Sequence, residues 1–301
     1  MFSLIVCTYN RQEYIYMALE HIAACHYPAD KYEIVLVNNK STDNTEQECR
    51  RFEAAYPDVP MRYFLETNQG LSHARNRGIA EAKGDVLVFL DDDSLVCPDY
   101  LQHLEAYVER YPDMMAFGGR IAPLFESGKE PEWLGKWSYS WVSAINKGDA
   151  VCLFEGSSYP IGANMGFRRS CIEMVGVFNT SLGRTEKNLM GGEEKDIFSR
   201  VRDKGYKIYY FPDINIQHVI PERRTTDQYI VRMAQGIGAS ERLRTRQLGG
   251  NAYAKRLLSE VVKWGGTMVL LVGYTLRLQW PKGSKLVLFR HHVTRGLLGI
   301  S

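Results

Sequence analysis

Three consecutive aspartates, Asp91, Asp92 and Asp93, directly follow the apolar run 86–90. Such a run is typical of a strand that is buried on both faces of a parallel sheet. Ligands of open α/β sheets bind outside the carboxyl ends of the strands, where these carboxylates would lie. Because adjacent carboxylates repel one another unless a cation joins them, the pattern predicts a divalent-metal site. The alternative interpretation is an acidic loop that precedes the next helix.

Three further polar stretches are expected near the same edge of the sheet. Residues 6–10 (V-C-T-Y-N) close the first predicted strand, residues 37–45 close the second, and residues 68–78 open a helix. Each stretch alone is weak evidence, since polar loops are ordinary. Parallel strands would bring all of them beside the aspartates, and this combination predicts a ligand site.

The first 118 residues alternate between strand and helix patterns, which predicts a mostly parallel sheet with right-handed crossovers. The strands are expected over 2–7, 32–37, 61–65 and 86–91, and the helices over 11–25, 42–56, 71–83 and from Pro98. Residues 123–160 are rich in proline, glycine and aromatic residues, which favours loops or a β-ribbon beside a cleft. Beyond them we expect helices over 170–175 and 193–204, a strand over 206–211, and helices from about residue 226.

The composition is that of an ordinary globular protein, with 301 residues, 45% hydrophobic and 24% charged. A net charge of +2 gives no reason to expect a nucleic-acid partner. The six cysteines form no C-x-x-C pair, which argues against a zinc ribbon. No signal-peptide pattern opens the chain, so we expect a reducing, cytoplasmic location.

The C-terminal part is basic and contains a largely apolar stretch from Trp264 to Trp280. These 17 residues are fewer than the roughly 20 apolar residues that a membrane-spanning helix needs. Flanking cations and terminal tryptophans favour an interfacial helix on the inner face of the cell membrane. Packing against the main domain is the alternative.

Taken in order, the motifs resemble glycosyltransferase family 2, the inverting enzymes with a GT-A fold. The resemblance covers roughly residues 1–225 and rests on V-C-T-Y-N, S-T-D-N-T (41–45), N-Q-G-L-S-x-A-R-N-x-G (68–78), L-D-D-D (90–93), G-G-E-E-K-D (191–196) and H-V-I-P-E-R (218–223). It implies a catalytic domain with a nucleotide-sugar-binding half (1–118) and an acceptor-binding half (119–225). Residues 226–301 would form a helical extension.

The resemblance implies transfer of a sugar from a nucleotide donor to a glycan or lipid-linked acceptor, as in surface polysaccharide synthesis. Many relatives carry an aspartate where this chain has Asn38 and Asn39, and an amide can accept or donate. UDP is therefore favoured but not fixed. Asp43 would hold either its loop or the nucleotide. The nucleotide-binding residues implied are Thr8, Tyr9, Asn10, Asn38, Asn39, Asp43, Arg75, Asp91 and Asp92.

Arg75 would pair with phosphate or aspartate, since its planar fork suits both; a surface helix charge is the alternative. The metal ligands implied are Asp93, Asp91 and His218, with Asp91 also able to act through ribose or water. Oxygen ligands suit Mn²⁺ or Mg²⁺. Asp92 takes the variable middle place of the motif.

Glu194 aligns with the family's catalytic-base aspartate, and Glu193 precedes it. Both open a predicted helix, whose dipole would lower the pKa of either acid; simple stabilisation of the helix start is the alternative. The acceptor side is expected to include Gly162, Asn164 and Trp133, although core packing is as good an account of the tryptophan.

Three other classes of protein fit the sequence less well. A dehydrogenase should show G-x-G-x-x-G after the first strand, and a sugar nucleotidyltransferase needs a glycine-rich phosphate loop there; residues 7–10 (C-T-Y-N) offer neither. A non-catalytic nucleotide- or sugar-binding protein would keep the fold but lose one acidic cluster. Both clusters are present, so we expect a metal-dependent inverting glycosyltransferase.

Overall fold

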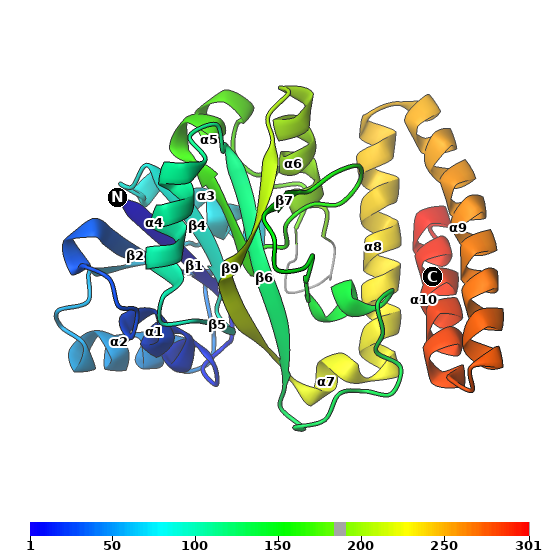
Figure 1. Cartoon of the computed structure of the whole chain (residues 1–301), viewed down its shortest axis with the longest axis horizontal. Helices are drawn as coiled ribbons and strands as arrows, with labels where there is room; N and C mark the ends of the chain where they lie inside the picture. Colours follow the sequence, from blue (N-terminus) through cyan, green and yellow to red (C-terminus); the bar gives the residue numbers. More distant parts are fainter. Residues whose placement is uncertain (184–190, 301) are drawn as a thin grey trace. The chain divides into compact units, whose positions relative to one another are not determined.

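The computed structural model describes residues 1–183 and 191–300, which form two compact units. The first, called here the sheet unit, comprises Met1–Leu124, Ser143–Ser181 and Glu193–Val219. The remaining described residues form the second, called the helical unit. Figure 1 shows the strands of the sheet unit and the long C-terminal helices of the helical unit.

The sheet combines a parallel and an antiparallel half. Strands β3 (Met61–Leu65), β2 (Tyr32–Asn38), β1 (Phe2–Thr8) and β4 (Val86–Asp91) are parallel neighbours in that order. The order then continues through β8, β6, β9 and β5, with β7 paired to β9, and antiparallel pairing joins β4 to β8 and β9 to β5. The bounds of these strands are Asn164–Arg168 (β8), Ala116–Phe125 (β6), Ile208–Ile220 (β9), Ser94–Val96 (β5) and Cys152–Leu153 (β7).

Helices cover both faces of the parallel half. Along β1, Leu4 and Val6 point into one hydrophobic core and Ile5 into the other, as expected when successive side chains alternate across a strand. The first core includes side chains of α1 (Ile15–Ala23), α2 (Thr45–Ala55) and α4 (Tyr100–Arg110). The second includes side chains of α3 (Leu71–Glu81), α5 (Arg169–Val175) and α6 (Glu193–Asp203). Strands β1, β2 and β4 are therefore buried on both sides, as their apolar runs predicted, whereas the edge strand β3 is only partly buried.

The α/β fold, its parallel strands and the helical C-terminal part are confirmed. No strand was predicted where residues 94–96 form β5, residues 116–125 form β6 and residues 164–168 form β8, and β7 lies in the region expected to form loops or a β-ribbon. The strand expected over 206–211 extends to Ile220, so His218 lies within β9 and not after it. Pro212 and Asp213 interrupt the apolar pattern there, and a three-residue strand such as β5 depends on pairing with its neighbour.

The helical unit contains α8 (Asp227–Gln247), α9 (Gly250–Leu276) and α10 (Trp280–Leu298), after the short α7 (Glu222–Thr225). Ion pairs centred on the buried side chains of Glu241, Arg256 and Glu260 join the three long helices. Arg256 Nε lies 3.1 Å from Glu241 Oε2, and Arg256 Nη1 lies 2.6 Å from Glu260 Oε2. Arg290 Nη1 lies 3.1 Å from Glu260 Oε1, so one carboxylate receives a guanidinium from its own helix and another from α10.

Residues 125–142 pack with these helices, since the Trp141 ring stacks on Phe289 with centroids 4.1 Å apart. The units therefore divide the chain differently from a single boundary at residue 225. The apolar stretch from Trp264 to Trp280 is also not one helix, because α9 ends at Leu276 and α10 begins at Trp280. Among the described residues, α9 alone is long and apolar enough to cross a membrane, judged by length and composition.

The variant Glu260→Gln tests the buried ion pairs of the helical unit. Although burial alone would raise the pKa of Glu260, the contacts with Arg256 and Arg290 lower it below the ordinary 4.5. We expect the substitution to reduce the free energy of unfolding of this unit by about 3 kcal/mol at neutral pH. Since the folded pKa is lowered, the stabilisation is complete above pH 4.5 and is lost as the pH falls through the lowered value.

Thermal unfolding of both proteins between neutral and acidic pH measures this difference. Exposed Glu222→Gln, in the same unit, is the matched control and should change little. A difference between wild type and Glu260→Gln that grows on acidification would contradict the assignment.

Candidate active site

The carboxyl ends of three parallel strands meet at one edge of the sheet. In the parallel register, Thr8 of β1 stands opposite Asn38 of β2, and Cys7 stands opposite Asp91 of β4. The loops that follow are tied together by side chains. The backbone N–H of Thr42 donates to Asn10 Oδ1 at 2.8 Å, and that of Asn10 donates to Ser41 Oγ at 3.0 Å. The predicted convergence of polar stretches is therefore present in the structure.

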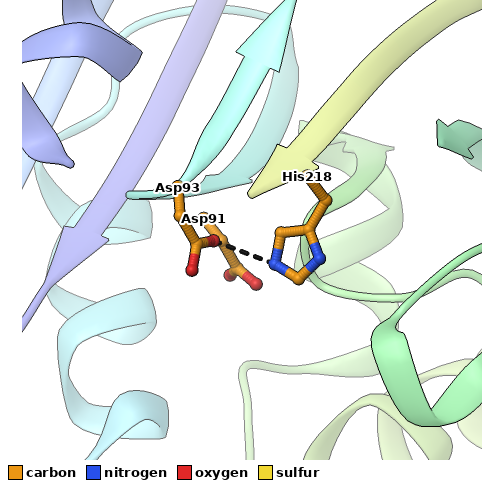
Figure 2. Close-up of side chains that lie close together, drawn as sticks. All are labelled: Asp91, Asp93 and His218. Atoms are coloured by element: carbon orange, nitrogen blue, oxygen red, sulfur yellow. Dashed lines mark ion pairs between the residues drawn. The ribbon is translucent and has the colours of Figure 1, made fainter. Parts of the chain in front are cut away.

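Asp91, Asp93 and His218 form a cluster with ligand atoms within 4.8 Å of one another (Figure 2). The antiparallel pairing of β5 with β9 produces it, because Ser94 stands opposite His218 in the register. His218 Nε2 lies 2.9 Å from Asp93 Oδ1, and the backbone N–H of Val219 donates to the carbonyl of Asp93 at 2.9 Å. Residues more than a hundred positions apart thus converge on one point.

The cluster fits a divalent cation. Asp93 and His218 are almost completely buried, and Asp91 is partly exposed. Two carboxylates and one imidazole make a donor set that suits Mn²⁺ and is compatible with Mg²⁺. Three successive carboxylates at a buried edge also concentrate negative charge that a cation would offset.

Arg11 was not singled out by the motif reading, although it directly follows V-C-T-Y-N. Its Nε lies 3.3 Å from Asp92 Oδ1 and its Nη2 lies 3.5 Å from Asp93 Oδ2. Asn10, just before it, adopts a left-handed backbone with φ 52°. Burial raises the pKa of Asp92 to about 7, an effect that Arg11 opposes and Asp93 reinforces. Arg11 therefore offsets the negative charge of Asp92 and Asp93.

Arg75 connects this motif to the helix that begins at Glu193. Its Nη2 lies 3.9 Å from Asp91 Oδ1 and 3.3 Å from Glu194 Oε1, while Nη1 lies 3.1 Å from Glu193 Oε1. Burial alone would lower the pKa of the guanidinium, but Glu194, Glu193 and Asp91 raise it, so Arg75 stays charged. With 2% of its surface exposed, Arg75 is not the surface helix charge that was the alternative.

The two glutamates at the start of α6 differ in their surroundings. Glu193 is buried and faces Arg75 Nη1. Glu194 is more exposed, with 19% of its side-chain surface accessible, and its Oε1 accepts from the backbone N–H of Gly162 at 2.8 Å. Glu194 is thus held from two directions and can still reach a ligand.

Gly162 permits this arrangement because it has no side chain. A Cβ on Gly162 would lie 1.9 Å from Arg75 Nη2 and 2.3 Å from Glu194 Oε1, so at least one of these side-chain ends would have to move. The glycine that the motif reading placed on the acceptor side is therefore in contact with the charged centre itself.

Several residues expected to bind nucleotide hold loops together. Asn39 is buried; its side chain donates to the carbonyls of Glu66 and Asn68 and accepts from the N–H of Gly70. Asn38 donates to Tyr63 Oη at 2.9 Å and accepts from the N–H of Ser41. Through these hydrogen bonds, both amide side chains hold the loops that lie beside the strand ends.

Asp43 acts on the same loops. Burial would raise its pKa, but Thr45 and the N–H of Gln12 hydrogen-bond its carboxylate and lower the pKa below the usual value. Of the two roles considered for Asp43, the contacts support the one that holds the loop. Thr8 is buried at the end of β1, and Tyr9 beside it is half-buried.

Two residues expected on the acceptor side have structural contacts. Asn164 is fully buried in β8, accepts from Tyr100 Oη at 2.6 Å and donates to the carbonyls of Arg120 and Ile214. Trp133 is buried in the helical unit, with its ring 5.8 Å from that of Trp141. For Trp133 these contacts agree with the core-packing alternative.

Comparison with known proteins agrees with this geometry. Residues 3–176 match the family model described as Glycosyl transferase family 2. The chain is 27% identical over 246 residues to a glucosyl-dolichyl phosphate glucuronosyltransferase of Haloferax volcanii. The aligned region covers 80% of this chain and 76% of the relative. It is also 27% identical over 219 residues to glycosyltransferase AglE of the same organism, covering 70% of this chain and 64% of that relative.

Two solved structures share the fold. A mannosyltransferase from Pyrobaculum calidifontis, in complex with GDP-Man and Mn²⁺, has a TM-score of 0.65 at 20% identity, covering 100% of this chain and 88% of that one. S. aureus TarS 1–349, in complex with UDP-GlcNAc, has a TM-score of 0.53 at 16% identity, covering 99% of this chain and 92% of that one. These likenesses show that the chain has a fold of the GT-A type.

The variant Gly162→Ala tests the close approach of Arg75 and Glu194. The added methyl group must displace one of them, so we expect the free energy of unfolding to fall by about 1–3 kcal/mol. Gly250→Ala is the control, because a Cβ there meets nothing within 4 Å. Urea unfolding of the two variants measures the effect. Equal stability of both variants would show that the centre tolerates the methyl group.

Proposed function

Because this chain belongs to glycosyltransferase family 2, we propose that it is a metal-dependent inverting glycosyltransferase that uses a UDP-sugar. The observation that supports this proposal most directly is the position of Arg75. One guanidinium nitrogen lies within 4 Å of both Asp91, at the metal-side cluster, and Glu194, the proposed base. The proposed metal site and the proposed base are thus adjacent.

Asp93, Asp91 and His218 would hold Mn²⁺ or Mg²⁺ at the donor diphosphate. The bound cation would supply charge neutralisation for the departing nucleoside diphosphate. Arg11 balances Asp92 and one oxygen of Asp93, and so keeps the carboxylates together. Arg75 adds positive charge on the side of the cluster that faces α6.

Glu194 would act as the general base. The acceptor hydroxyl oxygen bonds to the anomeric carbon as the bond from that carbon to the diphosphate oxygen breaks, and the hydroxyl proton passes to the Glu194 carboxylate. A single displacement of this kind inverts the anomeric configuration. The Gly162 N–H and Arg75 orient one carboxylate oxygen, which favours one direction of approach.

The nucleotide would lie over the strand ends, with its base beside Thr8 and Tyr9. Asn38, Asn39 and Asp43 contribute by fixing the loops around it. Similar structures hold UDP-GlcNAc in one case and GDP-Man in another, so the uracil preference is the finer part of the proposal. The glucosyl-dolichyl phosphate in the name of one relative supports a lipid-linked acceptor. We place the transfer at the cytoplasmic face of a membrane, in surface polysaccharide synthesis.

The variant Asp93→Asn tests the metal site. We expect the Mn²⁺-dependent affinity for UDP to fall by roughly 100-fold, because a ligand to the cation and the partner of His218 are both weakened. Titration calorimetry of UDP with Mn²⁺, and again with a chelator, measures the change. Exposed Asp58→Asn is the matched control. Wild-type turnover that is the same in chelator as in Mn²⁺ would remove the metal from the proposal.

A pair of variants, Glu194→Gln and Glu193→Gln, tests the base. Glu194→Gln keeps an oxygen for the Gly162 N–H but cannot take a proton, so sugar transfer should fall by roughly 10²–10⁴-fold with donor affinity nearly unchanged. Glu193→Gln should retain more transfer activity. Steady-state rates and the anomeric configuration of the product, read by NMR, give the answer. If only Glu193→Gln abolishes transfer, the base is the preceding residue.

A further inference from the structure

Helix α9 buries an ion-paired arginine and glutamate on one face and exposes a row of apolar side chains on the opposite face. Arg256 and Glu260 are buried in ion pairs with α8 and α10, and Thr267 is buried on the same face. The opposite face carries six large apolar side chains that are each 58–80% exposed. This α9 stripe consists of Leu258, Val261, Val262, Val269, Val272 and Leu276.

The spacing of the stripe shows that it is one continuous face. Its members follow one another at intervals of one, three, four and seven residues, which places them on one side of a helix. Gly265 and Gly266 lie between them, and a Cβ on either would meet open space. A soluble protein rarely exposes a contiguous apolar surface of this length without a partner for it.

The turn after α9 adds to the exposed apolar surface. Leu278 is 93% exposed and adopts a left-handed backbone with φ 56°, a conformation that costs free energy for a leucine. Trp280, two residues later, is 57% exposed. Neither placement improves the packing of the helical unit, so both suggest contact with something outside it.

The charge of the segment that forms α9 and α10 indicates which kind of partner could contact the α9 stripe. Residues 250–300 contain eight lysines and arginines and a single acid, Glu260, which is already paired with Arg256 and Arg290. A second copy of the same face would bring like charges together. A surface of anionic lipid headgroups is attracted instead, and it also accepts apolar side chains beneath the headgroups.

A spanning helix fits less well. The longest stretch of α9 without charge, from Trp264 to Leu276, has 13 residues. At 1.5 Å per residue it is about 20 Å long, short of the roughly 30 Å hydrocarbon core. The Arg256 and Glu260 pairs would also enter the hydrocarbon if α9 crossed it.

We propose that the α9 stripe lies in the plane of a membrane containing anionic lipids, with Lys255 and Lys263 at the headgroups. Both lysines are exposed on α9 between the inward charges and the stripe. The surface is wholly within the helical unit and does not depend on the transfer reaction; only its value for reaching a lipid-linked acceptor rests on the proposed function.

The experiment is co-sedimentation of the full chain with vesicles of phosphatidylcholine alone or mixed with phosphatidylglycerol. We expect binding to the mixed vesicles that weakens as salt is raised. The double variant Val262→Ser and Val269→Ser should reduce binding at least tenfold. The matched control, Met174→Ser and Val177→Ser, alters exposed apolar residues of the sheet unit and should bind like wild type.

Thermal unfolding and UDP binding are measured on the same proteins. Unchanged values in the stripe variant show that lost vesicle binding comes from the surface and not from misfolding or a failed active site. Lys255→Glu with Lys263→Glu should abolish the preference for phosphatidylglycerol. The proposal is overturned if both double serine variants bind vesicles equally, if the stripe variant dissociates a dimer in solution, or if only detergent releases wild type from mixed vesicles.

Discussion

A single buried guanidinium holds together the charged centre of this protein. Arg75 lies among carboxylates from β4 and α6, and each of its two terminal nitrogens faces at least one of them. Burying these acids without Arg75 would leave negative charges unbalanced in a poorly solvated site. The same contact orients Glu194, so the stability of the centre and the position of the proposed base have one physical origin.

Two local features complete the centre. The short β5 strand pairs with β9, and this pairing places His218 beside Asp93. Arg11 approaches the acidic motif from the loop after β1 and faces Asp92 and Asp93. Three carboxylates are therefore offset by two arginines, with an imidazole at the side where a cation fits. Such a balance keeps the acids close before any ligand binds.

In the helical unit, charged side chains form a buried ion pair and apolar side chains are exposed. There, the ion pair of Arg256 and Glu260 is buried, and the α9 stripe is exposed. Ordinary amphipathic helices bury the apolar side, because transfer of apolar surface from water is what stabilises packing. An inverted helix of this kind is stable when buried charges are fully paired and when another phase receives the outer face.

The sequence by itself determined the parallel strands, their helices and the residues that close each strand, because apolar runs and polar loop motifs are local signals. It also predicted that Asp93 and Glu194 carry chemistry, through a resemblance of motifs. Only the tertiary structure decided that Arg75 lies between Asp91 and Glu194, that Arg11 belongs to the acidic motif and that His218 lies in a strand. These are contacts between segments distant along the chain, and their energies come from pairing and burial, which no local pattern of residues encodes.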